Sequence, residues 1–124
     1  MRTEYDIWVY SSDVGDTRAI VGCSVEALDG GIGKIDEATE EVGGAFIVVD
    51  TGPWIFGRKV ILPAGVVERV DRDDERVYVH RTKEQIKNAP ELGEYTMSDD
   101  AHRDELGRYY GPEGAGWREP PRGV

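Results

Sequence analysis

Residues 45–65 read AFIVVDTGPWIFGRKVILPAG and contain two strongly apolar runs, Ala45 to Val49 and Val60 to Leu62. A connection marked by glycine and proline joins the two runs, which is typical of a β-hairpin. Both runs are too short for core helices and are rich in β-branched residues, so we expect strands. Because their apolar character is nearly continuous, the sequence predicts central strands with both faces largely covered.

Further strand patterns lie on both sides of this hairpin, at spacings of roughly ten residues. On its N-terminal side, Ile20 to Leu28 and Gly31 to Ala38 are joined by an Asp-Gly turn, a strong hairpin signal because glycine tolerates positive φ. On its C-terminal side, Val66 to Val70 and Arg76 to Arg81 carry alternating apolar residues. Such short strands joined by turns predict a mainly β fold, a small antiparallel β-barrel of about six strands.

The two ends of the chain differ from this strand-rich centre. Residues 1–19 contain the alternating segment EYDIWVY and predict an N-terminal arm or edge strand. The barrel domain is expected over residues 20–92 and ends in a short helix, where Thr82 and Gln85 have the spacing of a capping box. Residues 93–124 are rich in glycine, proline and charge and predict a partly ordered tail, with a short helix beginning at Ser98 or Asp99.

Length, charge and cysteine usage limit the class of protein. The 124 residues fit one domain with an appendage. The formal net charge of -10, from 25 acidic and 15 basic residues, disfavours a nucleic-acid partner. The single cysteine, Cys23, cannot form an internal disulfide and indicates a reducing compartment. The sequence shows no charged-then-apolar leader and no apolar run long enough to span a membrane, so we expect a cytoplasmic protein.

Three segments of the chain resemble a known family. VGCSVEALDGGIGKIDEA (21–38), FIVVDTGPWIFGRKVILPAGVVERVD (46–71) and VYVHRTKEQIKNAPEL (77–92) together resemble the PRC-barrel domain. This resemblance, over about Ile20 to Leu92, implies the small β-barrel shared by the cytoplasmic part of the photosynthetic reaction-centre H subunit and the C-terminal domain of the ribosome maturation factor RimM. It also implies docking onto protein partners, and it supplies no catalytic residue to carry over.

Two groups of aromatic and apolar residues are candidates for binding a partner. Trp54, Ile55 and Phe56 stand at the hairpin tip, where a solvated loop is usually polar. They can form a docking patch, as aromatic residues often do in interfaces, or fold back and plug the end of the barrel. In the tail, the aromatic residues can seal against the barrel or present a binding strip, and these are Tyr109, Tyr110 and Trp117.

A crowded acidic turn offers the only weak candidates for a metal site, namely Asp71, Asp73, Asp74 and Glu75. A hard cation such as Ca²⁺ could hold such carboxylates together. The turn is short, however, and lacks the spaced ligands and terminal bidentate glutamate of a dedicated site. A solvated hairpin turn is therefore the expectation, and no cofactor is predicted.

No set of residues in the sequence predicts catalysis. Cys23 has no adjacent base or cation that would lower its pKa, so it is expected to be a small core residue. His80 is expected to be a half-exposed strand residue, and no repeated spacing links it to His102. The chain is therefore interpreted as a non-enzymatic adaptor or scaffold module that binds a protein partner or itself, as a homodimer. The alternative is a protein that binds a small ligand or divalent metal at the barrel mouth or the acidic turn.

Overall fold

The computed structural model describes residues 7–8, 10, 17–39, 45–52, 59–90 and 100–118. In these residues, two short 3-10 helices, six strands and two α-helices follow one another along the chain. They are η1 (Thr17–Ile20), β1 (Ser24–Ala27), β2 (Gly30–Ala38), β3 (Phe46–Asp50), β4 (Lys59–Pro63), η2 (Ala64–Val66), β5 (Val67–Asp71), β6 (Arg76–Val79), α1 (Lys83–Lys87) and α2 (Asp100–Tyr110). The predicted mainly β fold with about six strands and a short following helix is confirmed.

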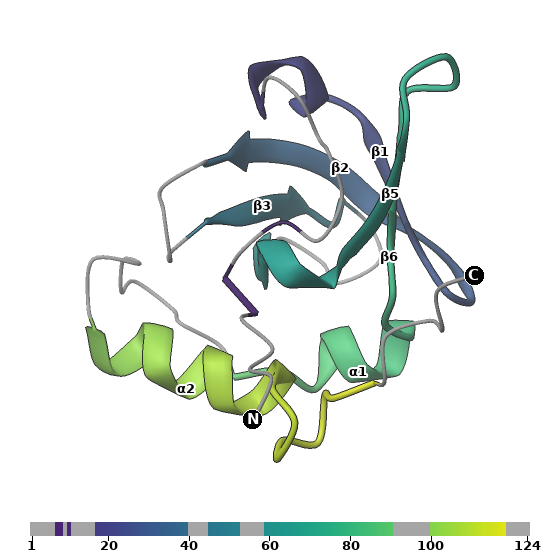
Figure 1. Ribbon diagram of the computed structural model, residues 1–124. Helices are drawn as coiled ribbons and strands as arrows, with labels where there is room; N and C mark the ends of the chain where they lie inside the picture. The colour runs from purple at the N-terminus through teal and green to yellow at the C-terminus, as the bar shows by residue number, and fades with distance from the viewer. Residues whose placement is uncertain are drawn as a thin grey trace, which may run out of the picture.

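The six strands form one sheet in the order β4-β3-β2-β1-β6-β5, so that β4 and β5 are its two edges. These edge strands are consecutive in the chain and are joined only by η2. In a flat sheet the edges would lie roughly 24 Å apart, whereas the link between them spans at most about 14 Å. The sheet must therefore curl into a barrel-like wall around one interior, as Figure 1 shows.

One strand pair departs from the predicted antiparallel barrel. β1 runs parallel to β6, with Ser24 beside Arg76 and Glu26 beside Tyr78. The reason is the link through η2: following the pairings around the sheet, β4 and β5 point in the same direction, so η2 is a corner and not a hairpin turn. Because the chain does not reverse direction at η2, β1 and β6 run in the same direction where they meet.

The prediction that the central hairpin supplies central strands is wrong for β4, which is an edge strand. On one side of β3 and β4, Ile47, Val49 and Leu62 are fully buried. On the opposite side, Val48 and Ile61 are only half-buried. The nearly continuous apolar pattern thus reflects a covered inner face and an apolar outer face that is partly exposed.

Two of the predicted strands begin later than expected. The strand expected from Ile20 starts at Ser24, because η1 ends at Ile20 and Gly22 has a φ of +92°. Val21 is consequently 46% exposed and does not belong to the inner face. The strand expected from Val66 starts at Val67, because the corner η2 includes Val66.

The predicted N-terminal arm is described at residues 7, 8, 10 and 17–19; Ile7 and Trp8 lie in a turn, and residues 17–19 belong to η1. Their carbonyl oxygens accept hydrogen bonds from the backbone N–H groups of Gly65, at 2.7 Å, and Ala45, at 3.0 Å. The arm thus contacts the corner between the two edges of the sheet. The rest of residues 1–19 up to Asp16 lies outside the described part of the chain.

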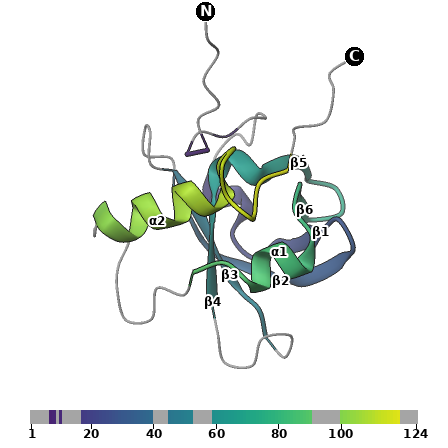
Figure 2. The ribbon, with the colours of Figure 1, turned by 90° about the horizontal axis from the view of Figure 1, so that it is seen from below.

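The helix after β6 begins with the predicted capping box. The Thr82 hydroxyl accepts a hydrogen bond from the Gln85 N–H at 3.1 Å, and the Gln85 side-chain oxygen accepts one from the Thr82 N–H at 3.0 Å. This exchange satisfies two of the N–H groups that the first helical turn leaves without partners. It fixes α1 directly at the end of the strand wall, close to α2 (Figure 2).

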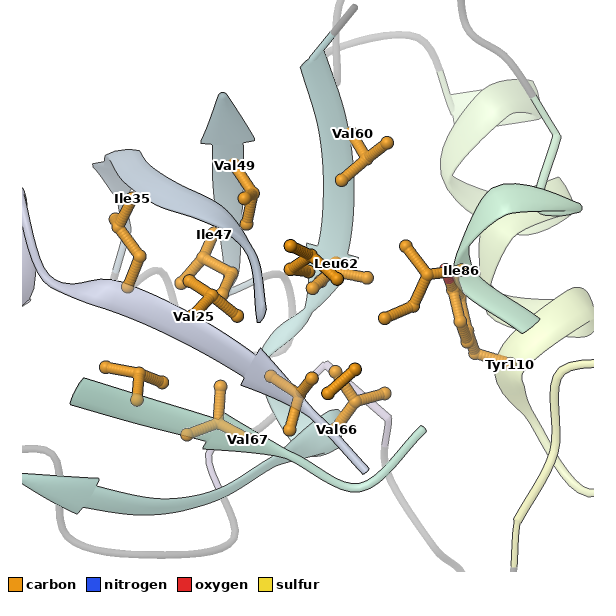
Figure 3. Packing of buried hydrophobic residues seen from close by; sticks show 14 of the residues in the cluster. Val25, Ile35, Ile47, Val49, Val60, Leu62, Val66, Val67, Ile86 and Tyr110 are labelled. Atoms are coloured by element: carbon orange, nitrogen blue, oxygen red, sulfur yellow. The ribbon is translucent and has the colours of Figure 1, made fainter. Parts of the chain in front are cut away.

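A single hydrophobic core fills the interior of the sheet and continues to both helices (Figure 3). Val25, Ile47 and Leu62 represent the strands in it, and all are fully buried. Ile86 from α1 and Leu106 and Tyr110 from α2 join the same cluster. α2 lies inside the segment predicted to be a tail, so this part of the chain contributes to the core. Among the described residues, no helix has the length and apolar character needed to cross a membrane.

Candidate interaction surfaces

The outer side of the β3–β4 hairpin carries a row of apolar side chains, which we call the hairpin face: Phe46, Val48 and Ile61. Val48 lies directly opposite Ile61 in the β3–β4 pairing. Since side chains alternate along a strand, these residues lie on the other face from the buried Ile47 and Val49. Phe46 and Ile61 also pack partly against the core cluster. The solvent side of an antiparallel sheet is ordinarily polar, so this row is a candidate contact surface.

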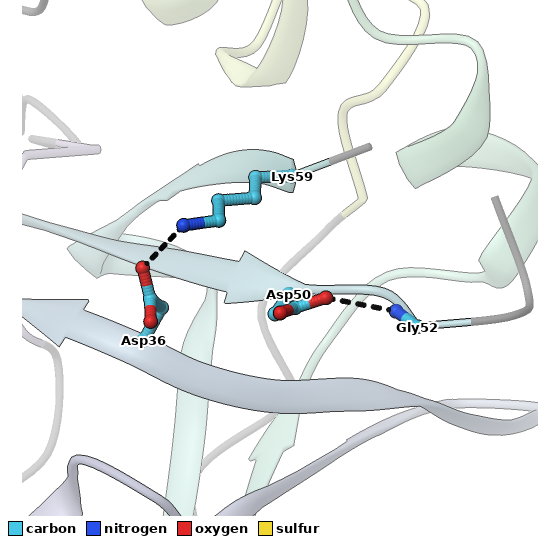
Figure 4. A network of polar contacts seen from close by, with 4 residues as sticks. All are labelled: Asp36, Asp50, Gly52 and Lys59. Carbon is cyan, nitrogen blue, oxygen red and sulfur yellow. Dashed lines mark hydrogen bonds and ion pairs between the residues drawn. The ribbon is translucent and has the colours of Figure 1, made fainter. Parts of the chain in front are cut away.

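Charged residues border the hairpin face at its open end. A register shift in β2 leaves Asp36 between the paired residues Ile35 and Glu37. Asp36 accepts a hydrogen bond from the Lys59 ammonium at 2.8 Å, so the Lys59 side chain reaches from β4 across β3 to β2 (Figure 4). This hydrogen bond, together with the charges of Asp36, Asp50 and Glu37, raises the pKa of Lys59.

The pattern of backbone hydrogen bonds between β3 and β4 shows which backbone groups of β4 point away from β3. The Ala64 N–H donates to the Ala45 oxygen at 3.0 Å, and bonded pairs recur at every second residue of an antiparallel ladder. Val60 and Leu62 therefore bond to β3, whereas Lys59, Ile61 and Pro63 direct their backbone groups to the free side of β4. Pro63 has no N–H, so this edge offers one donor fewer for pairing with another strand. In addition, α2 packs against β4.

The predicted docking residues at the hairpin tip, Trp54, Ile55 and Phe56, lie outside the described residues. The described part of the chain ends at Gly52 on one side of the tip and resumes at Lys59 on the other. At the first of these ends, Asp50 accepts a hydrogen bond from the Gly52 N–H at 3.0 Å. The choice between a docking patch and a plug of the barrel therefore stays open.

The aromatic residues of the tail that were predicted to seal or to bind, Tyr109, Tyr110 and Trp117, lie at the end of α2 and in the loop after it. Tyr110 is fully buried and is not available to a partner in this conformation. Tyr109 packs edge-on against Tyr110 at 4.9 Å between ring centres, and its hydroxyl donates to the Gln85 backbone oxygen at 2.6 Å. Burial raises the pKa of Tyr109, and the Glu84 carboxylate adds to this effect. Trp117 is half-buried beside them.

A buried arginine that the sequence reasoning missed organises this region. The Arg81 side chain is 1% exposed, and its guanidinium donates to the His80 oxygen at 2.6 Å and the Tyr110 oxygen at 3.1 Å. It lies 5.9 Å from the centre of the Tyr110 ring and 5.7 Å from that of Trp117. A signal was present in the sequence: Val77, Val79 and Arg81 follow at every second position, which assigns all three to the inner face.

The acidic segment between β5 and β6 forms a turn that is stabilised by its own hydrogen bond. Asp71 accepts a hydrogen bond from the Asp74 N–H at 3.1 Å, and Glu75 adopts a positive φ of 56° that reverses the chain. Asp73, Asp74 and Glu75 are exposed. Within the described part of the chain, no three histidine, cysteine, aspartate or glutamate side chains group closely enough to hold a metal ion.

Cys23 and His80 lie at opposite ends of the contact between β1 and β6. Ser24, next to Cys23, pairs with Arg76, four residues before His80. Four strand residues correspond to about 13 Å, so the fold does not join the two side chains. Burial raises the pKa of the Cys23 thiol, Glu75 adds to the rise, and Arg72 opposes it. His80 instead faces Glu68, with 3.6 Å between Nδ1 and Oε1. The side chain of His102 lies outside the described part of the structure.

Comparison with known proteins finds likenesses among solved structures. The chain resembles the crystal structure of a Pseudomonas aeruginosa protein named as the 16S ribosomal RNA processing protein RimM, with a TM-score of 0.47 and 19% sequence identity. The match covers 56% of this chain and 45% of that chain, so it spans less than half of the other protein. No family model matches the chain, and neither does any curated protein.

Proposed function

We propose that this chain is a non-enzymatic protein-interaction module of PRC-barrel type, which binds proteins through the hairpin face. The observation that carries the proposal is the apolar row on the outer side of β3 and β4. Val48 and Ile61 face each other there, and Phe46 lies two residues along β3 from Val48. All three residues are half-buried, and Phe46 and Ile61 are partly packed against the core cluster.

The surroundings of this row have the composition of a protein interface. Asp36 and Lys59 form an exposed ion pair at its border, with side chains 41% and 57% exposed. An apolar centre with a charged, solvated border is the common arrangement of protein–protein interfaces. The aliphatic filling of the barrel interior supports the same proposal, because it leaves the outer surface as the place where recognition occurs.

The size of the surface indicates that the hairpin tip takes part. A stable interface buries about 800 Å² on each partner, and three half-buried side chains supply only a fraction of that area. Trp54, Ile55 and Phe56 lie between β3 and β4 in the sequence and have large apolar side chains. We therefore propose that the hairpin face and the tip form one binding surface.

Self-association through this surface is a second part of the proposal. A two-fold contact would place the same patch on both copies. The net charge of -10 on each copy opposes such a contact. Salt screens this repulsion, so a homodimer should strengthen when NaCl is raised from 0.05 to roughly 0.5 M.

The experiment compares molecular mass by light scattering, and proteins captured from cell extract, for three chains. They are the wild type, the double variant Val48→Thr with Ile61→Thr, and the control Val21→Thr. Threonine keeps the β-branched shape that suits a strand and removes apolar surface. Val21 is exposed but lies outside the hairpin face.

We expect the wild type and the control to bind a partner or themselves equally, and the double variant to lose at least tenfold in affinity. Equal binding by all three chains would count against the hairpin face. A wild type that stays monomeric at every concentration and salt level, and that captures nothing specific, would overturn the interaction proposal itself.

A further inference from the structure

Residues 100–118 form a continuous body that we call the C-terminal strap. It consists of α2 and a return loop that folds back onto the end of the helix. Gly111 N–H donates to the Gly107 oxygen at 2.8 Å, and Gly116 N–H donates to the Tyr109 oxygen at 2.9 Å. A Cβ on Gly116 would stand 2.2 Å from the Tyr109 ring, so the loop can approach the ring this closely only with glycine at that position.

The strap is attached to the barrel through a set of polar contacts on residues 81–85. Arg81 donates to the Tyr110 oxygen at 3.1 Å, and Tyr109 donates to the Gln85 oxygen at 2.6 Å. The Gln85 side-chain amide donates in turn to the Trp117 oxygen at 3.2 Å. We call these three hydrogen bonds the latch. The positive Arg81 side chain lies at the C-terminal end of α2, where the helix dipole favours a cation.

Apolar burial of the strap is concentrated at the same end. Leu106 and Tyr110 are buried in the core cluster, and they are one helical turn apart. Most other described side chains of the strap are exposed, namely Asp104, Glu105, Arg108, Pro112, Glu113, Ala115 and Arg118. The strap therefore holds on by one helical stripe and the latch, with further contacts of the Trp8 ring with Gly107 and of Arg81 with the Trp117 ring, and no strand of the sheet pairs with it.

We propose that the strap is a releasable cover, which opens as one unit while the strand wall stays folded. Opening breaks the latch and withdraws Leu106 and Tyr110 from the core. It uncovers Ile86 and the side of β4 against which α2 packs. An isolated helix of this length is marginal in water, so the released strap loses its helical hydrogen bonds. This device concerns residues 100–118 and does not depend on the proposed function.

Native-state hydrogen exchange on the full chain tests the proposal. The amides of Gly111 and Gly116 report on the strap, and the amides of Ile35 and His80 report on the barrel through bonds to Cys23 and Val66. The test variant is Tyr109→Phe, which deletes one hydrogen bond of the latch and keeps the ring under Gly116. The control is Tyr78→Phe on β6, whose ring lies under Arg69 at 4.0 Å, outside the latch.

In Tyr109→Phe, we expect exchange at Gly111 and Gly116 to accelerate about fivefold, the effect of one hydrogen bond, with exchange at Ile35 and His80 unchanged. In the wild type, exchange of the strap amides should depend only weakly on urea, because a partial opening exposes little surface. If exchange of the strap and barrel amides accelerates equally in Tyr109→Phe, the proposal is overturned. The same holds if both sets of amides share one steep urea dependence in the wild type. Strap amides that do not respond to Tyr109→Phe would overturn the latch.

Discussion

At the scale of single residues, the buried Arg81 connects the end of β6 to the end of α2. A guanidinium with 1% exposure is stable only where carbonyl oxygens and aromatic rings replace its water. The His80 and Tyr110 oxygens do so from two directions. A flat, forked donor suits this geometry, whereas an ammonium group presents its donors around a single nitrogen.

We therefore predict that Arg81→Lys lowers the free energy of unfolding by about 1–3 kcal/mol, because hydrogen bonds from a charged group are lost. Urea denaturation measures the change. Arg69→Lys is the matched control, since the Arg69 side chain is 59% exposed, and we expect an effect below about 0.5 kcal/mol there. Equal losses in the two variants would contradict the structural role of Arg81.

Two residues with raised pKa values, Cys23 and Tyr109, predict how stability depends on pH. Burial is the main cause in both, and a folded-state pKa above the unfolded value means that the folded protein holds the proton more tightly. Their contribution to stability is complete below the ordinary pKa values of 9.0 and 10.0 and is lost as pH rises through the folded-state values. We expect the urea midpoint to fall progressively above pH 9, with a shallower fall in Cys23→Ala and in Tyr109→Phe. A midpoint that stays constant to pH 11 would be incompatible with both assignments.

At the scale of elements, some local signals in the sequence were accurate, whereas strand starts and the geometry between elements were not predictable. The capping box needs only Thr82 and Gln85, three residues apart, and it forms as predicted. The break before β1 depends on the positive φ of Gly22, which alternation of apolar residues does not reveal. The exposed ion pair of Asp36 with Lys59 depends on a register shift between β2 and β3, which arises from pairing across the sheet.

The close approach of β2 to β3 at Gly33 gives a prediction at this scale. Gly33 has a φ of +148°, and a Cβ there would stand 2.0 Å from the Asp50 oxygen. Gly33→Ala should therefore destabilise the protein by at least about 3 kcal/mol, combining backbone strain and a clash with the backbone. Gly22→Ala isolates the first effect, because its φ of +92° is strained while its Cβ would meet nothing within 4 Å. In thermal unfolding, the midpoint temperature of Gly33→Ala should be well below that of Gly22→Ala. The reverse order would contradict this register.

At the scale of the whole molecule, the order of the strands was the largest unknown. Nothing in the sequence of η2, which is Ala64–Val66, states that β4 and β5 lie at opposite edges of the sheet. That fact, and the parallel contact of β1 with β6, arise from contacts between residues some fifty positions apart, such as Val25 with Val77. The same limit applies to the candidate surfaces, because an apolar residue on a strand can be assigned to the inside or the outside only when the register is known.

The sequence therefore predicted the hairpin, and the structure showed that its outer side is a candidate surface. The tail aromatics were predicted as either a seal or a binding strip; Tyr110 is buried, whereas Tyr109 and Trp117 are half-buried. The role of Arg81 could have been predicted from its alternation with Val77 and Val79. Its position at the end of α2 could not, since Arg81 and Tyr110 are twenty-nine positions apart in the sequence.

The most direct test of the proposed binding surface is an amide NMR titration of labelled chain with its captured partner, or with unlabelled chain if light scattering shows self-association. We predict that the largest shift changes fall at Phe46, Val48 and Ile61, and that amides of β5 and β6 remain unchanged. Shift changes centred on β5, β6 or the C-terminal strap, with none at the hairpin face, would contradict the account.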